Sequence, residues 1–462
     1  MKCKGSAAIP VLIGIVSVLF FSCVTTKEKP IEKPEEITPN KPEQVYSTVE
    51  KYINDGNAED AVKEFDKIKD DSPESSIAYA GLLISAGKYD EAEDKLNSIL
   101  SQSPDNADAY FNLALISGLR GNIDKEKEQL EKAIECNPAH SEALAVRASL
   151  YLQDKKLDKA SDLYKKALDS DADNIIALTG LGTVLIRQEK YKEAEPYLDL
   201  AVKIDPSDPF TFLDRSSVRS ALKDYKGAEA DMSSAIELEP DYYWHYLDRG
   251  RLRLVKLGDR DGALEDFNKA IELKPEEFYP YVFRSGIYND MGKLKEAVAD
   301  YRKIIKLKPD YYFVYSSLGI ALFMLDDWDG SMTAFEKAFK YEPEEYAYLA
   351  MSAVAELKKN ESRADSMKYY KKLRDMIPVG NIYYHLMRSF IETGYDAYAI
   401  RLIQDEEDKN LQKRLLFYIA ELYKSRGMDS AAYNYFSEII AIKNLGYYES
   451  KIAEHEMEKI NE

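Results

Sequence analysis

Cysteine is scarce in this chain of 462 residues, which contains only Cys3, Cys23 and Cys136. A disulfide framework needs several cysteines that pair within a short chain, so three widely spaced cysteines exclude that class of protein. Whatever stabilises the fold must therefore come from packing of side chains and from hydrogen bonds.

Histidine and the motifs of enzyme sites are also scarce. No two of the four histidines have the spacing of a metal site on a helix. The sequence contains no glycine-rich phosphate loop, no G-x-S-x-G nucleophile elbow and no alternation of strand and helix for a dinucleotide site. We therefore expect no catalytic residue, no metal, no cofactor and no enzyme activity, and we expect structural roles for His140, His245, His385 and His455.

Positive charge is in deficit. The chain has 63 Lys and Arg residues against 82 Asp and Glu residues, which gives a net charge of −19. Nucleic acid and anionic lipid surfaces attract positively charged proteins, so this balance argues against both as partners. Charged residues nevertheless make up 31% of the chain beside 45% hydrophobic residues, a composition that suits a soluble, largely exposed surface over a folded core.

The sequence is rich in one repeated pattern, two short amphipathic helices joined by a turn, which is clearest in residues 250–275. There, Gly250 has no side chain where two helices approach, Gly258 marks the turn, and Pro275 ends the second helix. The ending prolines recur with a spacing of about 34 residues, a period typical of a helical solenoid. They are Pro73, Pro104, Pro138, Pro206, Pro240, Pro275, Pro309, Pro343 and Pro378, with Ala172 in the place of one proline.

These repeats resemble the tetratricopeptide repeat (TPR) family, in which a small residue, an aromatic residue and a final proline recur in the same order. Ala263, Phe267 and Pro275 carry that pattern in one repeat. The resemblance implies an all-α fold, a right-handed superhelix of about 12 helix-turn-helix repeats. We expect about ten repeats over 42–378, two degenerate repeats over 379–445, and a C-terminal capping helix over 446–462. In that last helix Ile452, Met457 and Ile460 should face the array, and Lys451, Glu454, Glu458 and Lys459 should face water.

The N-terminus resembles a bacterial lipoprotein signal. Residues 1–22 contain a positive end followed by an uncharged apolar run, as a secretory signal peptide does. The segment Phe20-Phe21-Ser22-Cys23 resembles a lipobox, which implies cleavage before Cys23 and attachment of lipid to it. Residues 23–41, rich in Pro, Lys and Glu, then predict an extended spacer. The alternative is an uncleaved N-terminal anchor, because the apolar run approaches membrane-spanning length.

The resemblance also indicates where a partner binds, because the first helix of each repeat lines a concave groove in this family. Aromatic residues are in excess there, and the position expected to face the groove is aromatic in four consecutive repeats. The other interpretation is that these rings only join one repeat to the next. The four residues are Phe210, Trp244, Tyr279 and Phe313.

Three central repeats carry an arginine where the family has leucine, on the inner side of the first helix, and also an aspartate on the second helix. Because the two residue types occur together, we predict ion pairs within each repeat. The functional alternative is a row of arginines that binds an acidic ligand. The expected pairs are Arg215–Asp231, Arg249–Asp266 and Arg284–Asp300, whereas Arg147 lacks the aspartate and should find another partner or remain solvated.

Cys136 stands two residues before Pro138, where neighbouring repeats have leucine. We therefore expect it to be a buried apolar side chain rather than a nucleophile.

These expectations combine into a non-catalytic TPR scaffold. It would be anchored through a lipid at the N-terminus on the periplasmic side of a bacterial envelope, with the outer membrane favoured. It would bind a protein or peptide in its groove. The alternative is an accessory or small-ligand-binding subunit of an envelope transport system. The sequence leaves the oligomeric state and the partner's identity open.

Overall fold

The computed structural model of the protein describes residues 42–68, 70, 72–359, 363–441 and 448–461. Within these residues the secondary structure is helical, with no strand. The chain divides into two compact units, residues 1–239 and 240–462. The signal, Cys23 and the spacer expected over 1–41 lie outside the described residues. In the part of the chain that is described, every helix is too short or too polar to span a bilayer.

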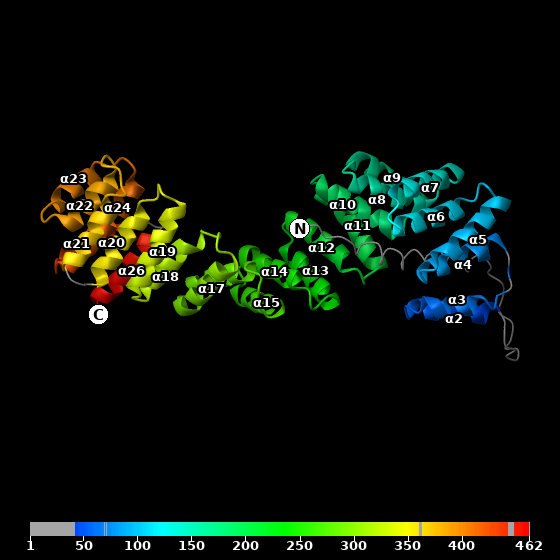
Figure 1. The fold of residues 1–462 in the computed structure, drawn as a ribbon, viewed down its shortest axis with the longest axis horizontal. Coiled ribbons are helices and arrows are strands. Elements are labelled where there is room, and N and C mark those ends of the chain that lie inside the picture. Colours follow the sequence, from blue (N-terminus) through cyan, green and yellow to red (C-terminus); the bar gives the residue numbers. More distant parts are fainter. Residues whose placement is uncertain (1–41, 69, 71, 360–362, 442–447, 462) are drawn as a thin grey trace. The chain divides into compact units, whose positions relative to one another are not determined.

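The first unit is a succession of helix hairpins in which each helix packs on the next along the chain (Figure 1). Its helices are α2 (Pro42–Asn54), α3 (Ala58–Phe65), α4 (Pro73–Ser85), α5 (Tyr89–Gln102), α6 (Ala107–Leu119), α7 (Ile123–Cys136), α8 (Ser141–Gln153), α9 (Leu157–Ser170), α10 (Ile175–Arg187), α11 (Tyr191–Ile204), α12 (Pro209–Ala221) and α13 (Tyr225–Leu238).

The second unit continues the same hairpin pattern and then adds a final helix (Figure 1). Its elements are α14 (Tyr243–Leu252), the π-helix η1 (Arg253–Leu257), α15 (Arg260–Leu273), α16 (Tyr279–Asp290), α17 (Leu294–Leu307), α18 (Val314–Met324), α19 (Trp328–Tyr341), α20 (Ala347–Lys359), α21 (Arg363–Arg374), α22 (Ile382–Ile391), α23 (Asp396–Gln404), α24 (Lys409–Ser425), α25 (Asp429–Ile440) and α26 (Tyr448–Asn461).

Local sequence signals set the helix boundaries. The side chains of Asn106 and Asn174 accept hydrogen bonds from backbone N–H groups in the first turns of α6 and α10, and so cap helices whose first N–H groups have no partner within the helix. At the other end, α11 stops at Ile204, two residues before Pro206, because proline cannot continue the helical hydrogen-bond pattern.

The two helices of a repeat approach closely where the first helix has a glycine. A Cβ atom added at Gly250 would lie 2.8 Å from Cε1 of Phe267 on α15, closer than real side chains come. The turn after this helix needs a left-handed residue, which Gly258 provides with φ +69°. Both glycines therefore have the roles that the repeat pattern predicts.

The last helices of the second unit do not simply add hairpins in sequence. α20 packs on α19 and α21 and also on α22 and α24, so it lies at the centre of this region. Residues 347–356 of α20 are buried without interruption, which a helix covered on several sides requires. This region contains the largest hydrophobic cluster of the second unit, and the periodic pattern of the sequence did not reveal that α20 would be its centre.

The C-terminal helix α26 packs on α25, α24 and α18. Ile452 is buried and Met457 packs at the edge of the core, while Lys451, Glu454 and Glu458 are exposed. The side chains of Lys459 and Ile460 lie outside the description. The expected amphipathic pattern omitted two residues of the inward face, however, because Glu449 and Glu456 are both buried.

The prediction that Cys136 is buried is wrong, because Cys136 is exposed at the end of α7. Comparison with leucines at the same position misled the prediction. The leucines at this position differ in burial, because Leu238 is exposed whereas Leu273 and Leu307 are half-buried. A leucine in a repeat is therefore no proof of burial at that position.

Candidate functional site

Three aromatic side chains of the second unit are exposed at the starts of successive first helices. Trp244 is the second residue of α14, Tyr279 is the first residue of α16, and Phe313 immediately precedes α18. Their relative exposures are 37%, 44% and 59% respectively. We call these three residues the aromatic row. Large rings exposed at equivalent places in neighbouring repeats make a candidate surface for contact with a partner.

Each ring of the aromatic row lies against the aromatic ring of the residue that precedes it. The ring centroids are 4.9 Å apart for Tyr243 and Trp244, and 4.1 Å apart for Phe278 and Tyr279 and for Tyr312 and Phe313. The preceding rings are buried or partly buried, so they hold the exposed rings in place. This support reduces the side-chain entropy that binding would remove.

Contacts between repeats also involve aromatic residues. Tyr311 lies 5.3 Å from the ring of Phe278 in the preceding repeat and 5.7 Å from the ring of Phe313. These neighbours therefore join repeats, as the second interpretation of the sequence proposed. Phe278, the ring that supports Tyr279, makes such a join, while the aromatic row itself keeps large exposed surfaces.

Phe210, the fourth expected residue, belongs to the first unit. It is the second residue of α12 and is 58% exposed. It therefore has the same place in its helix as Trp244.

The structure brings together the arginine and the aspartate of each of the three expected pairs. Arg215 Nη2 lies 2.6 Å from Asp231 Oδ1 in the first unit. In the second unit the same atoms are 2.6 Å apart for Arg249 and Asp266, and 2.7 Å apart for Arg284 and Asp300. All three aspartates are buried. Each guanidinium is already bound by a buried carboxylate. The geometry therefore favours structural ion pairs over a row of arginines that binds an acidic ligand.

Two of these aspartates also bind a second arginine, one helical turn along the first helix. Arg219 Nη1 lies 3.0 Å from Asp231, and Arg253 Nη1 lies 3.0 Å from Asp266. The sequence analysis missed these second arginines, although their four-residue spacing from Arg215 and Arg249 was a readable signal. Arg147 has a different partner, Glu131 on α7, at 2.6 Å.

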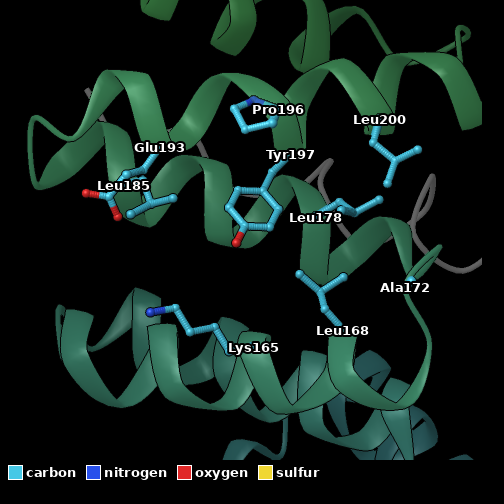
Figure 2. Close-up of a pocket in the computed structure, with 9 residues that line it drawn as sticks. All are labelled: Lys165, Leu168, Ala172, Leu178, Leu185, Glu193, Pro196, Tyr197 and Leu200. Atoms are coloured by element: carbon cyan, nitrogen blue, oxygen red, sulfur yellow. The ribbon is translucent and has the colours of Figure 1, made fainter.

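The first unit has an apolar pocket of about 600 Å³ between α9, α10 and α11 (Figure 2). Tyr197 and Leu200 on α11 face Lys165 and Leu168 on α9, with Leu178 of α10 between the two helices (Figure 2). Lys165 and Glu193 are the charged residues of the lining, and both are exposed. The lining thus offers apolar contact without a buried set of converging polar groups, which a specific small-ligand site normally has.

The pocket is where this repeat departs from its neighbours. Ala172 replaces the ending proline, Pro196 stands inside α11, and Tyr197 takes the place of the aspartate in the central repeats; all three line the pocket. The sequence showed each departure, but only the fold brought them together. Among the described residues, no three His, Cys, Asp or Glu side chains gather as a metal site requires.

Sequence comparison identifies the repeats. A family model described as tetratricopeptide repeat matches residues 83–150 and 151–209, a second so described matches residues 246–277, and a model described as TPR repeat matches residues 287–326. The matched segments lie in both units. No curated protein matches the chain.

Solved structures of TPR proteins are similar over part of the chain. YrrB, described as a TPR protein with an unusual peptide-binding site, is 23% identical, with 40% of this chain and 95% of YrrB covered and a TM-score of 0.37. The C-terminal part of a TPR repeat-containing protein from Cytophaga hutchinsonii is 19% identical, with 52% and 97% covered and a TM-score of 0.42. A tetratricopeptide repeat protein from Parabacteroides merdae is 18% identical, with 61% and 98% covered and a TM-score of 0.33. The peptide-binding site named for YrrB is a property of that protein.

Proposed function

Because the chain belongs to the tetratricopeptide repeat family, we propose that it is a non-catalytic scaffold that binds a protein or peptide partner through the aromatic row. The observation that carries this proposal is the exposure of Trp244, Tyr279 and Phe313 at equivalent places in three successive repeats. Rings of this size supply much of the binding energy in protein interfaces when a partner covers them.

The rings that support the aromatic row favour binding of an extended segment of a partner. Each exposed ring already rests on a neighbouring ring, so a partner meets a surface whose side chains have little freedom left to lose. An extended polypeptide can contact rings that recur once per repeat, because its side chains also recur at regular intervals.

We place the scaffold at a bacterial cell envelope, held to the membrane by lipid on Cys23 and facing the periplasm, with the outer membrane favoured. This part of the proposal rests on the sequence of residues 1–41, namely the apolar run, the cysteine and the spacer rich in Pro, Lys and Glu. An uncleaved anchor formed by the same apolar run is the alternative.

The rival function is binding of a small ligand as an accessory subunit of an envelope transport system, and the pocket beside Tyr197 is the observation that favours it. Its volume is in the range of small-molecule sites. Its charged residues are exposed and no buried polar group points into it, so the aromatic row remains the better-supported site.

The test is capture of a partner from envelope fractions by crosslinking to the full-length protein. Replacing Trp244, Tyr279 and Phe313 together by alanine should reduce capture at least fivefold, because a hot-spot residue contributes more than about 1 kcal/mol. Tyr433→Ala is the matched control, since Tyr433 is exposed in the same unit but stands on α25, away from the row. Unchanged capture by the triple variant, together with lower stability, would show that the rings only join repeats.

A further inference from the structure

Two carboxylates of the C-terminal helix α26 bind basic side chains of the neighbouring helices. Glu449 Oε1 accepts hydrogen bonds from Arg414 Nε at 3.0 Å and from the Tyr418 hydroxyl at 2.9 Å. Glu456 Oε2 accepts from Lys358 Nζ at 2.6 Å and from Lys424 Nζ at 2.7 Å. We call the four partners Lys358, Arg414, Tyr418 and Lys424 the α26 seat.

The spacing of the two carboxylates fits one face of a helix. Glu449 and Glu456 are seven residues apart, which is two helical turns and about 10 Å along the axis. Ile452 and Ala453 lie between them on the same face, and both are buried. The helix face that contacts the seat thus has an acidic residue at each end of a short apolar patch.

The charges of the seat are complementary to such a helix. Three of its four residues are cationic. The nearest buried acid outside α26 is Glu421, whose Oε2 lies 2.7 Å from Lys358 Nζ. Burial raises the pKa of Glu421 to about 7 even though Lys358 opposes the shift. The three cations Lys358, Arg414 and Lys424 outnumber the carboxylates beside them, Glu421 and the partly exposed Glu345 at 3.6 Å from Arg414, so the seat presents more positive than negative charge to a helix that approaches it.

Charged side chains make a large part of the buried contact of α26. On the neighbouring α24, all residues from 415 to 422 are buried, so that helix is fixed by a large apolar area. The described side chains of α26 that are buried are Glu449, Ile452, Ala453 and Glu456, half of them charged. Forming a buried ion pair gains little net free energy compared with leaving the charges in water, so the contacts of Glu449 and Glu456 add specificity to the apolar packing of Ile452, Ala453 and Met457.

We propose that the α26 seat is a docking site for an acidic amphipathic helix of another protein, and that α26 occupies this site in cis until such a helix displaces it. The proposal does not depend on the aromatic row. A second copy of this chain is a poor competitor, because it offers the same helix at a lower effective concentration than the tethered one. A foreign helix with a larger apolar patch between its two acids overcomes that disadvantage.

The test uses the full chain and a fluorescent peptide with the sequence of residues 448–461. In the variant Glu449→Lys/Glu456→Lys the chain's own helix no longer fits, so the peptide should bind with a dissociation constant at least tenfold below that for wild type, measured by fluorescence anisotropy. Glu454→Lys/Glu458→Lys is the matched control. It makes the same change of charge at exposed positions of the same helix and should bind the peptide as wild type does.

A peptide with lysine at positions 449 and 456 should not bind any of these proteins. The milder variant Glu449→Gln/Glu456→Gln covers the case in which charge reversal unfolds the region, and it should also bind the acidic peptide more tightly than wild type. Equal binding of the peptide by wild type and by a folded variant would overturn the proposal. So would a concentration-dependent wild-type dimer that is lost in the Glu→Lys variant, because a second copy would then be the occupant.

Discussion

Arg249 and Asp266 form the same bidentate contact as Arg284 and Asp300, although they are 17 residues apart in the chain and the other two are 16 apart. The π-helix η1 lies between the members of the longer pair. A π-helix accommodates one extra residue in a helix without shifting the residues before and after it out of register. The irregular helix therefore preserves the ion pair in a repeat that is one residue longer.

Removing Asp266 should strongly destabilise the second unit, because both Arg249 and Arg253 would lose their buried partner. We expect Asp266→Ala to lower the free energy of unfolding by about 3 to 5 kcal/mol. Asp248→Ala is the control, since Asp248 pairs with Arg251 at the surface and should cost about 1 kcal/mol or less. Urea unfolding followed by tryptophan fluorescence reports on this unit, since Trp244 and Trp328 are the only tryptophans in the sequence. Equal losses in the two variants would contradict a buried pair.

Deleting Val255 should convert the π-helix into a regular helix. Val255 is 65% exposed and has no core contact to lose, and the shortened repeat would match the 16-residue spacing of Arg284 and Asp300. We expect the free energy of unfolding, measured by tryptophan fluorescence, to change by less than about 1 kcal/mol, as for surface changes in general. Deletion of Asn289 in the regular helix α16 is the control and should cost more, because it removes a residue that the turn geometry needs. A loss of stability in the Val255 deletion as large as in the control would show that η1 has a packing role of its own.

His140 should make the first unit less stable as the pH rises. Its Nε2 lies 3.2 Å from Asp108 and its Nδ1 lies 3.1 Å from Glu142. Burial by itself would lower the pKa of His140, but the two carboxylates hold it raised, at about 9. Because the folded state keeps the proton more tightly than the unfolded state, this stabilisation is fully present below about pH 6.5 and is lost as the pH rises through about 9.

The size of the effect follows from the shift of pKa, at roughly 1.4 kcal/mol per unit, which gives roughly 3 kcal/mol between the two ends of the range. Hydrogen exchange of peptides from α6 to α8 at pH 6, 7.5 and 9.5, corrected for the intrinsic rate, measures the local opening free energy. His140→Gln should remove this dependence on pH. The same slope in the variant and in wild type would assign it to other groups.

Replacing Cys23 by serine tests the membrane anchor. We expect Cys23→Ser to leave an unprocessed precursor in the membrane fraction, whereas wild type yields a shorter chain that carries lipid at its first residue. Intact-mass measurement distinguishes the two forms. Identical masses for both proteins, apart from the substituted atom, would support the uncleaved anchor instead.

The sequence by itself determined the helical repeats, because a proline, a turn glycine and a small residue recur at a fixed spacing and each has a local steric effect. It also identified the three arginine and aspartate pairs, since partners on adjacent helices of one hairpin keep a nearly constant separation in the chain. These inferences succeed because they depend on neighbours within one repeat.

Only the tertiary structure decided what depends on distant residues. The exposure of Cys136 and the central place of α20 are set by which helices cover a position, and the repeat pattern is silent about that. The same holds for the α26 seat, where Glu456 meets Lys358 across almost a hundred residues of chain. A glutamate on an amphipathic helix is normally a solvated residue, so its burial follows only from the cations that the fold brings to it.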